Sequence, residues 1–388
     1  MPWGATNELP YDILNLIESD EVLQTCQSFN AEVSYAQGIV YQNQGKYSNE
    51  IEDLFQNSDM PAYFLGAVQD FNHFAFSVSV IILNRKRDRI VRIERKEAIY
   101  CRFAPKNDKG VIPYLVYANF RNSTAPKDFE VYPLLNPNCL LHDLQEKVKS
   151  NKNDYAFAVV SRMPTVDSTY YPIPHYAALF KGHWYDIKQL IGIAKKAKLQ
   201  NSAPIKYLIE VSRQYWQNIF TAEGITDINK KQERLAKEKK NIIDFLTGAE
   251  NSGKVWFSNF YVDPTGKEQH DVKITKVDSA KEGGDWESDI QEAINMYCFT
   301  MRVHSNLVGS VPGKAQSNNS GSDKRELYTI AQALKKPYRD ILFNVHRLII
   351  AFNGWKGVKP LCPFIQLTTL DEHVDAKTVT TKEIEYGK

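Results

Sequence analysis

The chain has 388 residues, a formal net charge of +2 at pH 7, 43% hydrophobic residues and 24% charged residues. This composition is ordinary for a globular protein with two or three core-bearing segments. The net charge is too small to indicate by itself a nucleic-acid or membrane partner, although charged residues can still gather on one face of the protein.

The cysteines and the start of the chain favour a cytoplasmic setting. Five cysteines lie far apart without a C-x-x-C pair, which predicts reduced thiols. The first residues, MPWGATNELPYDIL, have neither the basic nor the apolar region of a signal peptide. The longest apolar run, Val78–Leu83, is too short to cross a bilayer, so we expect no membrane partner.

The first part of the chain, residues 1–176, is predicted to be one α+β domain. Helical patterns cover Tyr11–Gln27 and Asn49–Asn57. From Phe74 the pattern changes to short strand-like runs with charged separators, which favours an antiparallel meander. A helix at CLLHDLQEKVKS and a strand at YAFAVVSRM follow.

The middle of the chain predicts a small α+β insertion between two helices. The first helix, 177–200, ends in the basic residues Lys195, Lys196 and Lys198, which on the simplest interpretation complement the helix dipole. The insertion, 201–281, contains strands at IKYLIEV, KVWFSNFYV and DVKITKV and a charged helix. The second helix, 282–308, carries a stripe of five apolar side chains: Trp286, Ile290, Ile294, Tyr297 and Met301.

A loop of small and polar residues, 309–322, follows the second helix. Asp323 and Glu326 form a D-x-x-E cap for a long helix that ends at 353. Pro337 is expected to kink this helix or split it after Lys336. A strand at FIQLTTL and a polar tail complete the chain.

The stretch LTGAENSGKVWFSNF comes close to a phosphate-binding loop, because Gly248 is followed by Gly253 and Lys254 at the required spacing. Val255 replaces the Ser or Thr that binds magnesium. The expected order, helix before and strand after, is also the reverse of a phosphate loop. We therefore expect a helix cap at Gly248 and a turn.

Other catalytic or metal-binding patterns are not found in the sequence. The closest histidines, His175 and His183, are interpreted as structural. No nucleophile–base pair is suggested, so we expect no enzyme activity, no metal and no cofactor. A long polar loop between two helices is usually either functional or disordered. Its polar side chains can touch phosphate but cannot read bases rigidly: Lys314, Gln316, Asn318 and Asn319.

The order of these elements resembles that of the portal proteins of tailed bacteriophages. Four stretches carry the resemblance: KLQNSAPIKYLIEV, FLTGAENSGKVWFSNF, DIQEAINMYCFTMRVHSNLVG and SGSDKRELYTIAQALKKPYRDIL. The sequence departs from the family at Ser305-Asn306-Leu307, where Val-Pro-Pro is common. The large crown of some members is also reduced here to a short tail.

The resemblance implies a portal-like α+β fold. Its parts are a wing domain (1–176), a first stem helix (177–200), a clip domain (201–281), a second stem helix (282–308), a tunnel loop (309–322), a tunnel helix kinked at Pro337 (323–353), and a strand returning to the wing plus a tail (354–388). It implies a ring, typically of twelve subunits, at the unique capsid vertex. Double-stranded DNA is packaged and ejected through its channel without sequence recognition.

The resemblance also implies partners and site residues. The partners are the terminase large subunit, a head–tail adaptor, and the major capsid or scaffold protein, with assembly in the bacterial cytoplasm and a final place in the virion. The implied DNA-channel residues are Lys314, Gln316, Asn318, Asn319, Lys335 and Lys336, with the stem lysines Lys195, Lys196 and Lys198 nearby. The implied clip turn is formed by Gly248, Asn251, Gly253 and Lys254.

Two other functions stay open at this point. One is a cytoplasmic DNA-processing or replication accessory protein whose GAENSGK loop binds phosphate. The other is a different component of a capsid or tail connector.

Overall fold

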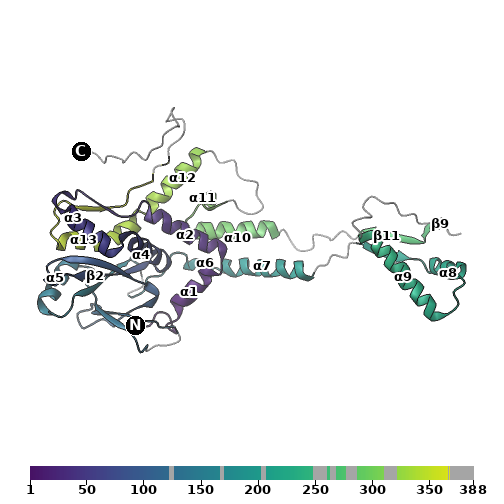
Figure 1. The fold of residues 1–388 in the computed structure, drawn as a ribbon, viewed down its shortest axis with the longest axis horizontal. Coiled ribbons are helices and arrows are strands. Elements are labelled where there is room, and N and C mark those ends of the chain that lie inside the picture. The colour runs from purple at the N-terminus through teal and green to yellow at the C-terminus, as the bar shows by residue number, and fades with distance from the viewer. Residues whose placement is uncertain are drawn as a thin grey trace. The chain divides into compact units, whose positions relative to one another are not determined.

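The computed structural model describes residues 1–121, 126–166, 170–201, 207–247, 260–262, 268–276, 286–309, 321–365 and 367 (Figure 1). The chain divides into two compact units. The first combines Met1–Ile191 with Glu287–Lys388, and the second is Gly192–Trp286. Both units contain helices and small antiparallel sheets, so the predicted α+β class is correct at this level.

Four helices form the N-terminal part of the first unit: α1 (Leu9–Glu18), α2 (Glu21–Tyr35), α3 (Ser48–Ser58) and α4 (Met60–Phe74). The single helix predicted over Tyr11–Gln27 is wrong, because the chain breaks between α1 and α2. Asp20 adopts an extended backbone there and caps α2 with its carboxylate. Ten of the fifteen residues of α4 are buried, so this helix lacks the one-sided pattern of a surface helix.

Six strands of the first unit form two three-stranded antiparallel sheets. In the first sheet, β2 (Phe76–Leu83) lies between β3 (Ile90–Lys96) and β7 (Ala156–Arg162). In the second, β5 (Tyr114–Tyr117) lies between β4 (Cys101–Phe103) and β6 (Glu130–Pro133).

The predicted single meander is therefore wrong. A 3₁₀ turn at Ala98–Tyr100 ends the first hairpin before β4 begins. After α5 (Leu140–Ser150), β7 returns to the free edge of β2.

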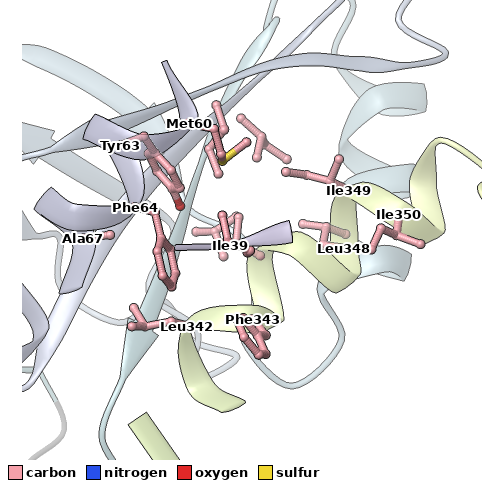
Figure 2. Close-up of a cluster of buried hydrophobic side chains, with 14 of the residues drawn as sticks. Ile39, Met60, Tyr63, Phe64, Ala67, Leu342, Phe343, Leu348, Ile349 and Ile350 are labelled. Atoms are coloured by element: carbon pink, nitrogen blue, oxygen red, sulfur yellow. The ribbon is translucent and has the colours of Figure 1, made fainter. Parts of the chain in front are cut away.

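The main core of the first unit joins the N-terminal helices to a helix near the C-terminus, α13 (Lys336–Phe352). Figure 2 shows side chains of α4 gathered beside those of α13. The rings of Phe64 and Phe343 are stacked with centroids 6.5 Å apart. The short strand β1 (Val40–Gln42) also pairs with β12 (Lys359–Leu361), so both ends of the chain contribute to this unit.

The strand predicted at FIQLTTL is wrong for its described residues, which have no regular structure. The side chain of Gln332 binds the backbone of Ile365 instead. Gln332 Nε2 donates to the Ile365 carbonyl at 2.9 Å, and the Ile365 backbone amide donates to Gln332 Oε1 at 3.1 Å. The C-terminal strand of this region is β12, a few residues earlier.

The helix predicted over 177–200 is interrupted in the structure. It consists of α6 (Ala177–Lys181) and α7 (Trp184–Asn201), separated by Gly182 and His183. His183 has a left-handed backbone (φ 63°). A Cβ at Gly182 would lie 3.0 Å from the Ala178 carbonyl oxygen, so a larger residue is disfavoured at this bend.

The second predicted helix is also divided. Its described part is α10 (Trp286–Met301), and the short α11 (Ser305–Val308) follows after a break. Ile294, Tyr297 and Met301 of the predicted stripe are buried. The chain then continues, beyond residues that are not described, in α12 (Gly321–Leu334), which begins two residues before the predicted cap at Asp323.

The described residues of the second unit after α7 include two helices and two strand pairs. The helices are α8 (Arg213–Ala222), which the sequence pattern did not predict, and α9 (Ile228–Thr247). Strand β8 (Tyr207–Val211) pairs with β11 (Val272–Lys276), and β9 (Phe260–Val262) pairs with β10 (Glu268–His270). Among the helices described in both units, none has the length and apolar character needed to cross a membrane.

Candidate functional site

The helices α12 and α13 meet at Lys335, one residue before the predicted split. Pro337 lies in the first turn of α13, where its missing N–H leaves no helical hydrogen bond unmade. Lys335 is the residue between the helices. The long helix expected over 323–353 is therefore two helices with a defined break.

The two lysines at this break have different environments. Lys336 is exposed and forms an ion pair with Asp340, at 2.5 Å between Nζ and Oδ2. Lys335 is only 6% exposed. Lys335 is therefore much less accessible than Lys336 in the isolated chain, and its role as a DNA contact stays a prediction.

Two of the stem lysines are more accessible. Lys195 and Lys196 are exposed on α7, and Lys198 belongs to the same helix. The predicted tunnel-loop residues Lys314, Gln316, Asn318 and Asn319 lie outside the described residues.

The clip-turn residues Gly248, Asn251, Gly253 and Lys254 also lie outside the described residues. The elements on either side of this stretch are described: α9 precedes it and β9 follows it. This is the helix-then-strand order predicted from the sequence, and it is the reverse of a phosphate-binding loop.

Asp20 joins three helices of the first unit. Its Oδ1 accepts hydrogen bonds from the amides of Val22 and Leu23 at the start of α2, at 3.1 and 3.0 Å. Its Oδ2 accepts from three side chains on α7 and α10: Lys188 Nζ at 2.9 Å, Gln189 Nε2 at 3.1 Å and Tyr297 Oη at 3.1 Å.

The charges around Asp20 are compensated. Burial opposes the charge of Lys188, but hydrogen bonds to Glu21 and Asp20 outweigh it, so the Lys188 pKa is raised. Burial and the Asp20 charge raise the pKa of the Tyr297 phenol, which remains a hydrogen-bond donor. Sequence reasoning missed this cluster, and its one local signal was an Asp directly before a helical run.

Among the helices that expose large apolar side chains are α7, α10 and α12. On α7 these are Ile187, Leu190 and Ile193, three residues apart, with Leu190 63% exposed. On α10 Phe299 is 79% exposed, and on α12 Ile330 and Leu334 are exposed. Spacings of three and four residues place side chains on one face of a helix. Exposed apolar faces of this kind are typical of protein–protein contacts.

The described residues offer little for catalysis. No group of three metal-binding side chains is found among them. One cavity of ≈ 410 Å³ is lined partly by Asp70, His73 and Arg95. Asp70 is held there by two hydrogen bonds from Arg95, from Nε at 2.7 Å and from Nη2 at 2.9 Å. Burial lowers the pKa of His73, and its Nδ1 bonds to the Gln69 carbonyl. The arrangement is that of a structural ion pair.

The comparisons with known proteins support a likeness of fold. No family model and no curated protein matches the sequence. Solved structures do match. A chain in the neck of a native GTA particle, computed with C12 symmetry, has a TM-score of 0.59 and 14% identity, over 94% of this chain and 86% of that chain.

Two related structures give similar values. A chain of the virion of a native gene transfer agent (GTA) particle has a TM-score of 0.57 and 12% identity, over 90% of this chain and 83% of that chain. A chain of the neck of an empty GTA particle, computed with C6 symmetry, has a TM-score of 0.58 and 14% identity, over 91% of this chain and 84% of that chain. The resemblance predicted from the sequence is thus confirmed at the level of the fold, which is that of a chain in a particle neck.

Proposed function

We propose that this chain is the subunit of a portal, a ring at the unique capsid vertex through which double-stranded DNA is packaged and ejected. The observation that carries the proposal is the shared fold with a chain of a particle neck over 94% of this chain. A fold alone does not assign a function. The proposal therefore also depends on surface features that fit a ring and a channel.

The exposed apolar faces favour a ring. Ile187 and Leu190 on α7, Phe299 on α10 and Leu334 on α12 are all more than a third exposed in the isolated chain. Contact with a second copy would remove these side chains from water, which stabilises association. A head-to-tail contact that repeats with a constant rotation closes into a ring, and we propose twelve subunits.

The channel is proposed to contact DNA loosely. The net charge of +2 is small for a protein that surrounds a polyanion. Each phosphate that a protein neutralises adds affinity, so a strongly basic channel would retain DNA rather than pass it. The proposed transient contacts are Lys195, Lys196 and Lys198 on α7, Lys336 on α13, and the side chains of the 309–322 loop.

The proposed ring has no catalytic role of its own. The energy for packaging comes from the terminase large subunit, which is proposed to dock on the ring, as is a head–tail adaptor. The major capsid or scaffold protein is the proposed partner at the capsid vertex. The particle is assembled in the bacterial cytoplasm, and the ring becomes part of the virion.

The test is electron microscopy of the purified protein, together with a measurement of its native mass in solution. We expect ring-shaped particles with a central channel, a mass of about twelve subunits, and no ATP hydrolysis above background. A monomer that hydrolyses ATP would favour the DNA-processing protein instead. Closed rings without a channel wide enough for double-stranded DNA would favour another connector component.

A further inference from the structure

Lys335 is a largely buried cation that has no anionic partner among the described residues. It is 6% exposed, and its Nζ lies 4.7 Å from the centre of the Tyr338 ring. Within the described part of the chain, no carboxylate forms an ion pair with it. The next residue, Lys336, is exposed and does have such a partner in Asp340. Burial of an unpaired ammonium is costly, so its position at a helix junction needs an explanation.

The groups around Lys335 are also basic. Burial, together with the charges of Arg302 and Arg339, lowers the pKa of Lys335 to about 7. Burial, together with the charges of Lys335 and Arg302, lowers the pKa of His175 to about 4, against an opposing hydrogen bond to the Met301 backbone. Arg339 is buried and donates to the carbonyls of Gln332 at 2.6 Å and Val33 at 3.4 Å.

These basic groups come from three parts of the first unit. Lys335 and Arg339 belong to the α12–α13 junction, Arg302 follows α10 and is exposed, and His175 precedes α6. The His175 Nε2 is buried and has no hydrogen-bond partner among the described residues. We call these four residues the junction cluster. In the isolated chain it holds several cationic or proton-accepting groups and no described carboxylate that pairs with Lys335.

Exposed apolar side chains adjoin the junction cluster in the sequence. Leu334, directly before Lys335, is 59% exposed, and Ile330 is one turn earlier on the same helix. Phe299 is 79% exposed, and its carbonyl accepts the amide of Arg302 at 3.1 Å. An apolar surface around a charged centre is typical of a subunit interface, where the charged centre sets the register of the partner.

We propose that the junction cluster receives a carboxylate side chain from a second copy of the chain. This inference rests on the ring of the proposed function and adds the chemistry of one subunit contact. A carboxylate would compensate Lys335 and Arg302 at once and supply the acceptor that the cluster lacks. A DNA phosphate fits less well, because a phosphodiester backbone is too bulky to reach a side chain that is 6% exposed beside exposed leucine and phenylalanine.

The direct test is a zero-length cross-link in assembled rings. Rings are formed from a mixture of copies labelled with heavy nitrogen and unlabelled copies, then treated with a carbodiimide, which joins an amine to a carboxylate as an amide. We expect mass spectrometry to find the Lys335 peptide linked to an acidic peptide of the other isotope. Rings in which Lys335 links only within one copy, or does not link at all, would overturn the inference.

A pair of variants provides a second readout. Lys335→Met keeps the length of the side chain and removes its charge, whereas Lys336→Met removes the exposed neighbouring charge. We expect Lys335→Met to raise the concentration needed for half-assembly about tenfold or more, as for the loss of one charged hydrogen bond. Its melting temperature as a subunit should be unchanged or higher, because an unpaired buried charge is gone.

We expect Lys336→Met to assemble like the wild type. Equal assembly of wild type and Lys335→Met would overturn the inference while leaving the ring intact. If the wild type forms no ring at any concentration, the proposed function fails and this contact fails with it. The native mass of the wild type without carbodiimide distinguishes this result from failure of the contact alone.

Discussion

Lys188 Nζ lies 2.9 Å from Oδ2 of Asp20, and the two side chains are 10% and 0% exposed. Asp20 also caps α2, and Lys188 belongs to α7. One buried carboxylate thus fixes the start of one helix and holds the start of another against it. Because Tyr297 of α10 bonds to the same oxygen, this one side chain links α2, α7 and α10.

Replacing this carboxylate should destabilise the first unit. Asp20→Ala removes the cap of α2 and leaves Lys188 and Tyr297 without their shared acceptor. We expect the free energy of unfolding in urea to fall by about 2–4 kcal/mol. The matched control is Asp186→Ala on α7, whose exposed carboxylate pairs with His183; it should change stability by less than about 0.5 kcal/mol. Equal effects of the two substitutions would contradict the role of Asp20.

The helices show what sequence periodicity can and cannot predict. The helix over α10 was predicted because its stripe of apolar residues is one-sided, and Ile294, Tyr297 and Met301 are indeed buried. α4 was missed because it is buried on most sides. The breaks at Asp20 and His183 were missed because the apolar pattern continues across them, although both are local: Asp20 caps α2, and His183 has a left-handed backbone.

The sheets and the site show a second limit. The sequence runs that correspond to β2, β3, β4, β5 and β7 were located, whereas β1, β6 and β12 were not. The pairing of β7 with β2 depends on the path of the chain through α5. At the helix junction, two neighbouring lysines look equivalent in the sequence. Adjacent residues on a helix point about 100° apart, so one of them is buried and the other is exposed, and only the packing decides which.

The exposed face of α7 gives a test of assembly that leaves the fold intact. Leu190 is 63% exposed, so Leu190→Glu should not disturb the core of the subunit. In a ring it would place a charge in an apolar contact, at a cost of about 2 kcal/mol or more per interface. We therefore expect sedimentation velocity to show mostly unassembled subunits. Lys195→Glu, an exposed change on the same helix, is the control and should still form rings; rings of Leu190→Glu with normal stability would exclude this face from the interface.

His346 predicts part of the dependence of stability on pH. It is fully buried, its Nδ1 is 2.8 Å from the Tyr41 hydroxyl, and burial lowers its pKa from 6.5 to about 3. Between these values the unfolded chain binds a proton that the folded chain does not bind. The contribution of the neutral, buried His346 to the free energy of unfolding is therefore fully present above pH 6.5 and is lost as the pH falls toward 3.

The substitution His346→Asn isolates this contribution, because it keeps an acceptor for Tyr41 without a group that titrates in this range. As the pH falls below 6, we expect the free energy of unfolding of the wild type to decrease relative to that of the variant, by up to about 1.4 kcal/mol per pH unit. Urea unfolding at pH 7, 6 and 5 measures the difference. Parallel profiles of the two proteins would show that His346 does not contribute.

Lys254 provides a test of the nucleotide-binding alternative. The helix-then-strand order around its stretch and the presence of Val255 both argue against a phosphate loop. Lys254→Ala should leave ATP binding at the background level of the wild type, measured by equilibrium dialysis with and without magnesium. Saturable, magnesium-dependent binding that the substitution abolishes would support the DNA-processing protein.

The loop at 309–322 is proposed to contact DNA during packaging. It is rich in small residues and carries Lys314, Gln316, Asn318 and Asn319, which offer short-lived contacts to the DNA backbone rather than a fixed grip. Deleting several residues between 312 and 320 should spare ring assembly, because the exposed apolar faces of α7, α10 and α12 are unchanged.

Packaging or retention of DNA should be impaired in the shortened protein, measured as the length of DNA protected from nuclease inside particles. A variant of full length, with Gln316, Asn318 and Asn319 all replaced by serine, separates loop length from side-chain contacts. If contacts matter most, both variants are defective; if reach matters most, only the shortened one is. Normal DNA content in both would reduce the loop to a connection between α11 and α12, and the proposed tunnel would have to be abandoned.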